Sequence, residues 1–305
     1  MKKIFVTFIA LILLVGCSAP KAVTKEKIEI THKLGTTEVE TNPEKVFVFD
    51  MGIVDIMKTL ELNIGGVPVE SLPTPLKDVN KEGIVNIGSL FEPDFEKIAE
   101  EAPNLIIVSG RSSKHYEQLS EIAPTIYMGS DVSSEGLLAS INKNVETFGL
   151  IFPDTNFDKA TASLETAIKE VHDKAEKSGY NTLFLMANGN EIRAFGPGSR
   201  YDHVFTTFGF KSVADNIEES THGSGLSYEL IQSLNPDVII VMDRGAIVKG
   251  DKTAEELMDN AFVKETEAAK NNRIIYVDPQ NWYLTEGGIQ SILSMSKELN
   301  NLFAQ

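Results

Sequence analysis

Arg111 and Arg244 occupy equivalent places in two copies of one sequence pattern. FEKIAEEAPNLIIVSGR (residues 95–111) and YELIQSLNPDVIIVMDR (residues 228–244) share an aromatic start, a central Pro, a β-branched run and a final Arg. Self-similarity at a fixed offset indicates two copies of one structural unit. A guanidinium group stays charged and donates paired hydrogen bonds, which suits an anionic oxygen ligand. Two such groups predict one shared anionic ligand, whereas a solvated loop charge is the simpler explanation for either arginine alone.

The elements around each arginine indicate how it is positioned. Each copy begins as an amphipathic helix that a Pro ends, because the residue before Pro avoids the helical region. The apolar run that follows is typical of a strand buried on both faces of a parallel sheet. Each Arg comes just after this strand, and open α/β sheets place their ligand crevice at the carboxyl ends of the strands. The sequence therefore predicts two lobes that each offer one Arg to a common cleft.

Each copy also carries an acid one position after its aromatic start, Glu96 in the first and Glu229 in the second. A negative charge in the first turn of a helix suits the helix dipole. The two acids stand at the other end of the repeated unit from the arginines, so we expect them away from the cleft.

Strands and helices alternate along the rest of the chain and predict an α/β fold with mostly parallel pairing. Residues 156–178 contain no Gly or Pro and many strong helix formers, so we expect one long helix there. The predicted fold is two Rossmann-like lobes, residues 43–150 and 179–305, joined by an interlobe helix within residues 151–178. Other expected elements are a short hairpin within 29–42, a strand at 181–188 paired with 191–195, and helices at 113–122, 253–270 and 288–303.

The N-terminus has the features of a secretory signal. A charged start precedes the apolar run FVTFIALILLV, which is too short for a spanning helix with these flanks. Cys17, the sole cysteine, ends the segment LVGC, which resembles a lipobox. We expect a signal peptide over residues 1–16, lipidation of Cys17 and a polar anchor and tether over residues 17–42. The alternative is an ordinary buried cysteine behind an uncleaved anchor.

Charge and motifs narrow the class of function. The net charge of −16 argues against nucleic acid as a partner. The chain has no histidine pair with zincin spacing and no G-x-S-x-G elbow, and residues 196–200 lack the Lys-Ser/Thr ending of a phosphate loop. Since we can assemble no pair of nucleophile and base, we predict that the protein is not an enzyme.

Two loops carry further candidate binding residues. His222 lies in the Gly-rich turn THGSG (221–225), although a lone loop histidine is more often ordinary surface. Trp282 and Tyr283 follow the predicted strand at residues 273–277, again at a carboxyl end. An aromatic side chain there suits ligand binding, and partial packing of the single Trp into the core is the alternative.

Five segments in this order resemble class III periplasmic binding proteins, and more closely their branch that binds iron–catecholate siderophores of the enterobactin and petrobactin types. The resemblance covers nearly the whole chain from about residue 40, and each segment alone is a weak signal. The segments are VSGRSSKHYEQLSEIAPT (108–125), AFGPGSRYDHVF (194–205), THGSG (221–225), VMDR (241–244) and DPQNWYL (278–284).

The resemblance implies a role for several side chains. In this branch three arginines line the cleft and face the catecholate oxygens, which by motif are Arg111, Arg200 and Arg244. In some members a His and a Tyr complete the coordination of ferric iron when the siderophore is only tetradentate, which by motif are His222 and Tyr283. With a hexadentate chelate these two side chains would only line the pocket.

Four more residues take implied places. Tyr201 and Trp282 are expected in the ligand cleft beside the residues above. The family uses one Glu in each lobe to dock onto arginine pockets of the permease. Glu96 and Glu229 match those positions, and the repeated pattern selects the same two residues.

The implied function is that of a lipid-anchored receptor on the extracytoplasmic face of the cell membrane. It would capture a ferric siderophore, of the petrobactin or enterobactin type, and deliver it to an ABC permease and its ATPase. The iron arrives chelated, so no cofactor is expected. We expect a monomer that meets the membrane only through its lipid and closes by a small hinge motion.

Two other classes remain open from the residues alone. One is a receptor of the same fold for haem, cobalamin or another iron chelate. A bare metal ion would need more protein ligands than one His and one Tyr, and cobalamin carries too little negative charge to need three arginines. The other is a secreted α/β hydrolase, which would require a nucleophile and base that we do not find.

Overall fold

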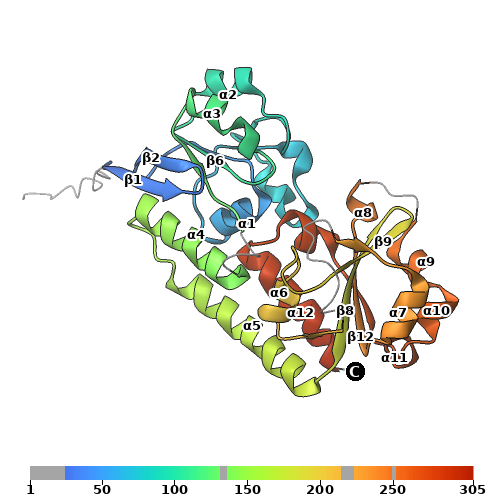
Figure 1. Ribbon diagram of the computed structural model, residues 1–305. Helices are drawn as coiled ribbons and strands as arrows, with labels where there is room; N and C mark the ends of the chain where they lie inside the picture. Colours follow the sequence, from blue (N-terminus) through green and yellow to red (C-terminus); the bar gives the residue numbers. More distant parts are fainter. Residues whose placement is uncertain (1–24, 131–135, 214–222, 249–251, 305) are drawn as a thin grey trace, which may run out of the picture.

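The computed structural model describes residues 25–130, 136–213, 223–248 and 252–304. They form two α/β lobes, coloured blue to green and yellow to red in Figure 1. The long helix α5 (Asp158–Ser178) runs along one side of the molecule and links them, as the sequence predicts. The predicted signal peptide and the predicted lipidation site, Cys17, lie outside the described residues. Within the described ranges, no helix has the length and apolar content needed to cross a membrane.

The N-terminal lobe is built on a five-stranded parallel sheet in the order β5-β4-β3-β6-β7. The central strands β3 and β6 are fully buried, because helices cover both faces of a parallel sheet. The region expected as one helix at 113–122 is a 3₁₀ turn, Ser113–His115, that continues into α3. The elements are β3 (Val46–Val48), α1 (Met51–Thr59), β4 (Gly66–Val67), β5 (Val85–Asn86), α2 (Phe95–Glu101), β6 (Leu105–Val108), α3 (Tyr116–Ser120), β7 (Thr125–Tyr127) and α4 (Leu137–Ile151).

The C-terminal lobe has a mixed sheet in the order β11-β9-β8-β12-β13, with β10 also paired to β8. Strands β8, β10, β12 and β13 are parallel, and β9 forms the predicted antiparallel pair with β8. Its strands are β8 (Asn181–Asn188), β9 (Glu191–Phe195), β10 (Lys211–Ser212), β11 (Ser224–Gly225), β12 (Val238–Asp243) and β13 (Ile274–Val277). Its helices are α6 (His203–Thr206), α7 (Tyr228–Leu234), α8 (Gly245–Val248), α9 (Ala254–Met258), α10 (Ala261–Lys264), α11 (Glu267–Lys270) and α12 (Ile289–Asn301).

The prediction of a single helix over residues 253–270 is wrong, because this stretch forms the three short helices α9, α10 and α11. Thr253, Asn260 and Thr266 each precede one of them and accept a backbone N–H bond through the side chain. Such side chains cap a new helix rather than continue an old one, which divides the stretch twice.

The repeated pattern is repeated in three dimensions. Helices α2 and α7 each begin at a side-chain cap, Asp94 or Ser227, and each end at a residue in the left-handed region. These end residues are Ala102, with φ of 44°, and Asn235, with φ of 42°. The strands that follow, β6 and β12, each pair in parallel with the first strand of the central sheet of their lobe, which is β3 for β6 and β8 for β12.

The hairpin expected within residues 29–42 forms from β1 (Lys27–His32) and β2 (Gly35–Glu40). It packs on the N-terminal lobe, where Thr37 Oγ1 donates a 2.9 Å hydrogen bond to the backbone oxygen of Thr125. The expectation of a tether over the whole of residues 17–42 is therefore wrong for the hairpin, which belongs to the lobe.

The lobes are also joined directly, through α1 of the first and α12 of the second. The buried carboxylate of Asp55 on α1 accepts hydrogen bonds of 2.9 and 3.0 Å from the backbone nitrogens of Gln290 and Ser291, at the start of α12. Gly288 leaves room for this contact, since a Cβ there would lie 2.5 Å from Asp55 Cγ. One apolar cluster contains side chains of both lobes, from Val46 to Trp282. These contacts fix the lobes relative to each other.

Candidate functional site

Three of the chain's five arginines converge on Tyr283. Arg111 follows β6, Arg244 follows β12, and Arg200 lies in the turn after β9. Their guanidinium carbons lie 5.4, 5.4 and 4.6 Å from the centre of the Tyr283 ring. Tyr283 lies on a short π-helical turn, Gln280–Leu284, that follows β13. The structure thus brings together four residues that are separate in the sequence.

Hydrogen bonds fix this arrangement. Arg244 Nε donates to the phenol oxygen of Tyr283 at 3.1 Å, and Arg244 Nη1 donates to Asn188 Oδ1 at 2.6 Å. Arg111 Nη2 and Arg200 Nη2 both donate to the backbone oxygen of Tyr283, at 2.9 and 3.1 Å. Arg111 belongs to the N-terminal lobe, so its bond crosses from one lobe to the other.

The arginines change the acidity of the phenol. Burial alone would raise the pKa of Tyr283, but the hydrogen bond from Arg244 and the charges of Arg244, Arg200 and Arg111 outweigh it. The pKa of Tyr283 is therefore lowered from its ordinary value, because nearby positive charge favours the phenolate. The Tyr283 residue as a whole is half-buried.

Arg200 is held differently from the other two arginines. Its Nε and Nη2 donate to Glu286 Oε2 at 3.0 and 2.9 Å, and the Glu286 side chain is only 7% exposed. Burial would lower the pKa of Arg200, but the Glu286 carboxylate reverses this effect and raises it above its ordinary value. Arg200 is therefore a permanent cation whose charge is partly offset by a fixed anion.

A cavity of about 720 Å³ opens beside the cluster, and both lobes line it. Arg111, Arg244 and Tyr283 line it, together with Lys77 and the acids Glu70 and Asp278. Its lining also includes two partly exposed apolar side chains, Phe91 of the N-terminal lobe at 56% and Val248 of the C-terminal lobe at 45%. The cavity can accept a bulky ligand that presents negative charge to the arginines and apolar surface to Phe91 and Val248.

Two residues expected in the cleft lie in the core instead. Trp282 and Tyr201 are both 0% exposed and stack on Phe184, with ring centres 5.6 and 4.5 Å from it. Trp282 Nε1 donates to Glu298 Oε2 at 2.8 Å, so its polar atom is satisfied inside the protein. Neither side chain has surface to offer a ligand in this structure, and core packing of the Trp is the correct interpretation.

His222 lies outside the described residues, so its predicted role stays a prediction. The described part of that turn begins at Gly223, whose φ of 70° suits glycine and whose Cβ would lie 2.6 Å from the ring of Phe195. Among the residues that the structure describes, no group of three or more His, Cys, Asp or Glu side chains could hold a metal ion.

The two acids of the repeated pattern lie at the surface. Glu96 and Glu229 are both exposed and stand in the first turns of α2 and α7. In each lobe this turn lies before the strand whose far end carries the cleft arginine. The acids are therefore separate from the cleft, as expected from the sequence.

Sequence reasoning missed Asn188 and Glu286, the residues that hold Arg244 and Arg200. Asn188 could have been found from sheet register, because Asp243 pairs with Ala187 and so the next residues, Arg244 and Asn188, are neighbours. Glu286 lies 86 residues from Arg200 in a loop without periodicity, and no local pattern selects it.

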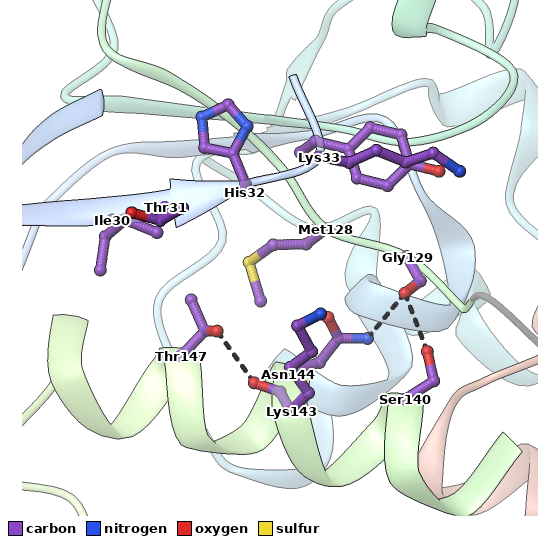
Figure 2. Close-up of a pocket in the computed structure, with 11 residues that line it drawn as sticks. Ile30, Thr31, His32, Lys33, Met128, Gly129, Ser140, Lys143, Asn144 and Thr147 are labelled. Carbon is purple, nitrogen blue, oxygen red and sulfur yellow. Dashed lines mark hydrogen bonds between the residues drawn. The ribbon is translucent and has the colours of Figure 1, made fainter. Parts of the chain in front are cut away.

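A second cavity, of about 490 Å³, lies between the N-terminal hairpin, the end of β7 and α4 (Figure 2). Ser140 Oγ and Asn144 Nδ2 both donate to the backbone oxygen of Gly129, at 3.3 and 3.2 Å. Ile30 and Met128 supply apolar lining. These bonds tie α4 to the strand end, and we assign this cavity no ligand.

The fold and the cleft define a two-lobed binding protein. Residues 48–281 match the model of the family described as "Periplasmic binding protein". The chain belongs to this family, whose members bind substrates and are not enzymes.

The names of two curated relatives state what they bind, petrobactin for one and ferric anguibactin for the other. The chain is 39% identical to the petrobactin-binding protein YclQ of Bacillus subtilis (strain 168), over 99% of both chains. It is 32% identical to the ferric-anguibactin-binding protein FatB of Vibrio anguillarum, over 93% of this chain and 91% of the relative.

Solved structures agree in fold. The crystal structure of YclQ matches with a TM-score of 0.87 and 40% identity, covering 92% of this chain and all of the other. The catecholate-siderophore binding protein VctP of Vibrio cholerae matches with a TM-score of 0.83 and 30% identity, covering 90% of this chain and all of the other.

Proposed function

We propose that this protein binds a ferric siderophore in the cavity between its lobes and passes it to an ABC permease for iron uptake. The observation that carries the proposal is the convergence of Arg111, Arg200 and Arg244 on Tyr283 beside a cavity that both lobes line. The whole chain has a net charge of −16, so three cations around one side chain form a local positive site that suits an anionic ligand, even though Glu286 partly offsets Arg200.

Ferric catecholate chelates have the chemistry that this site accommodates. They spread several negative charges over aromatic oxygens, and guanidinium groups both donate to such oxygens and stack on aromatic rings. The partly exposed side chains of Phe91 and Val248 suit the organic part of the chelate. The names of the relatives support this class, and the identity to YclQ favours a petrobactin-type ligand.

Tyr283 is the proposed link to the iron itself. Ferric iron favours oxygen donors, and the lowered pKa of Tyr283 makes its phenolate easier to form. With a tetradentate siderophore, Tyr283 and His222 would fill the two positions left open on the iron. With a hexadentate siderophore, no position on the iron is left open, and Tyr283 would only line the pocket.

We also propose where the protein acts in the cell, which is the extracytoplasmic face of the membrane. Lipidation of Cys17 would hold the receptor at the extracytoplasmic face of the membrane as a monomer, and the permease with its ATPase would be the partner. Exposed Glu96 and Glu229 suit docking onto basic pockets. The double variant Glu96→Ala/Glu229→Ala should keep siderophore affinity and lose uptake in cells, and a fall in affinity would contradict this placement.

The direct test is quenching of Trp282 fluorescence, which reports on the site because Trp282 is the single tryptophan and precedes Tyr283. Ferric petrobactin and ferric enterobactin should quench it tightly, while a ferric hydroxamate, haem and cobalamin should not. Quenching by haem or cobalamin alone would overturn the proposed ligand. Tyr283→Phe should lose affinity for tetradentate chelates if the phenolate ligates iron.

A further inference from the structure

Glu286 is a buried acid that the proposed function does not by itself explain. Its side chain is 7% exposed, and Oε2 accepts two hydrogen bonds from Arg200. Oε1 has no hydrogen-bond partner among the described residues, and His203 Nδ1 lies 3.7 Å from it. A carboxylate buried beside an anion-binding cleft opposes binding by its charge, so its presence calls for a compensating role.

The other ionisable side chains around Glu286, those of His203 and Tyr201, carry no charge. His203 is 0% exposed, and burial lowers its pKa, so it stays neutral and adds no charge beside the carboxylate. Tyr201 is equally buried, and burial raises its pKa, so its phenol stays protonated. Arg200 is therefore the ionic partner that the described residues give Glu286.

The geometry of Arg200 follows from this pairing. Paired donation through Nε and Nη2 to a fixed carboxylate defines the direction of a guanidinium plane, which a single bond does not. In that direction Arg200 lies 4.6 Å from the Tyr283 ring centre, nearer than either other arginine, and donates to the Tyr283 backbone. Its side chain is 27% exposed, and Arg200 is absent from the lining of the cavity.

We propose that Glu286 is a positioning residue for the cleft, which fixes Arg200 against Tyr283 so that Arg200 acts on the ligand mainly through that tyrosine. This inference rests on the proposed function for its effect on binding. Arg111 and Arg244 then meet the anion directly. Arg200, which Glu286 fixes, holds Tyr283 in place.

The test for binding is a double-mutant cycle with ferric petrobactin. Glu286→Ala and Arg200→Ala should each weaken binding about 10-fold, since each removes the ion pair that fixes Arg200 against Tyr283. The double variant should bind no more weakly than Arg200→Ala, because Glu286 acts through that side chain. Glu286→Gln keeps an oxygen acceptor and should restore most of the affinity. Losses that multiply, or an unchanged affinity in Glu286→Ala, would overturn the inference.

A second measurement needs no ligand. The chain has five arginines, so the side-chain Nε–H signals in a nitrogen–proton spectrum are few. The Arg200 signal, identified by its loss in Arg200→Lys, should be sharp and slow to exchange in the wild type and in Glu286→Gln. It should broaden or vanish in Glu286→Ala, and a signal unchanged in Glu286→Ala would contradict the positioning role.

Arg273 offers a matched control. It also lies over a tyrosine, 4.5 Å from the Tyr180 ring centre, with an acid nearby at Asp237, but at the amino end of β13, away from the cleft. Arg273→Ala should leave ferric petrobactin affinity and the Arg200 signal unchanged. If the wild type binds neither ferric petrobactin nor ferric enterobactin while the Arg200 signal depends on Glu286, the proposed function fails and the positioning role stands.

Discussion

The two copies of the repeated unit place their arginines alike but give them different partners. Arg244 is fixed within its own lobe by Asn188 and donates to the Tyr283 phenol. Arg111 donates across the cleft to the Tyr283 backbone, on the other lobe. Strand β8 continues to Asn188 beside Arg244, whereas β3 ends at Val48, opposite Ile107. A duplicated unit thus sets where a charge stands, and the neighbouring elements decide what holds it.

The largest expected effect separates the two arginines. Arg244→Ala should weaken ferric petrobactin binding about 100-fold and Arg111→Ala about 10-fold, within the roughly 1.5–3 kcal/mol of a charge-assisted hydrogen bond. Arg244 is oriented by two bonds, to Asn188 and to the Tyr283 phenol, whereas Arg111 is held by one bond, to the backbone of the other lobe. Fluorescence titration of both variants measures the difference, with Arg273→Ala as control. Equal losses, or a larger loss in Arg111→Ala, would show that pre-orientation does not matter here.

A smaller effect compares the helix ends. Ala102 is exposed and has a left-handed backbone, which strains any residue with a Cβ, so Ala102→Gly should stabilise the protein by about 0.5–1 kcal/mol. Asn235 has the same backbone, but its Oδ1 accepts a 2.9 Å bond from the backbone nitrogen of Glu267. Asn235→Gly loses that bond and should be neutral or destabilising. Urea denaturation of both variants checks this, and equal stabilisation would show that the side-chain bond contributes nothing.

The smallest effect concerns pH. The pKa of folded Tyr283 lies below that of an unfolded tyrosine, about 10. Between the two values the unfolded chain holds more protons, so the free energy of unfolding gains a term that rises with pH and is lost as pH falls through the folded pKa. Subtracting the Tyr283→Phe profile isolates this term. It should shrink more in Arg244→Ala than in Arg111→Ala, and the opposite order would contradict the assigned hydrogen bond.

Much of the fold and of the cleft could be predicted from the repeated sequence pattern. Its helix, strand and terminal Arg appear in both lobes because local periodicity, capping residues and Pro determine them. The long helix α5 and the hairpin β8–β9 were also predicted correctly, since each is a continuous pattern of one period.

The rest depends on contacts between distant segments. Trp282 follows a strand as a binding aromatic would, yet its ring packs on Phe184, nearly 100 residues earlier. Glu286 reaches Arg200 only because the loop after β13 folds back over the turn after β9. Residues 253–270 divide into three helices because a capping side chain precedes each one. The prediction of one helix followed the helix-forming composition of the stretch and did not weigh these caps.

The contact between Asp55 and the start of α12 also bears on how the chain folds. It joins residues 235 and 236 positions apart, so the first N–H groups of the last α-helix are satisfied by a side chain near the beginning of the chain. Contacts of such sequence separation are slow to form, because a long loop must close before they give any stabilisation. The contact between the lobes can therefore form only after the C-terminal residues have been synthesised, and Asp55 stays without these partners until then.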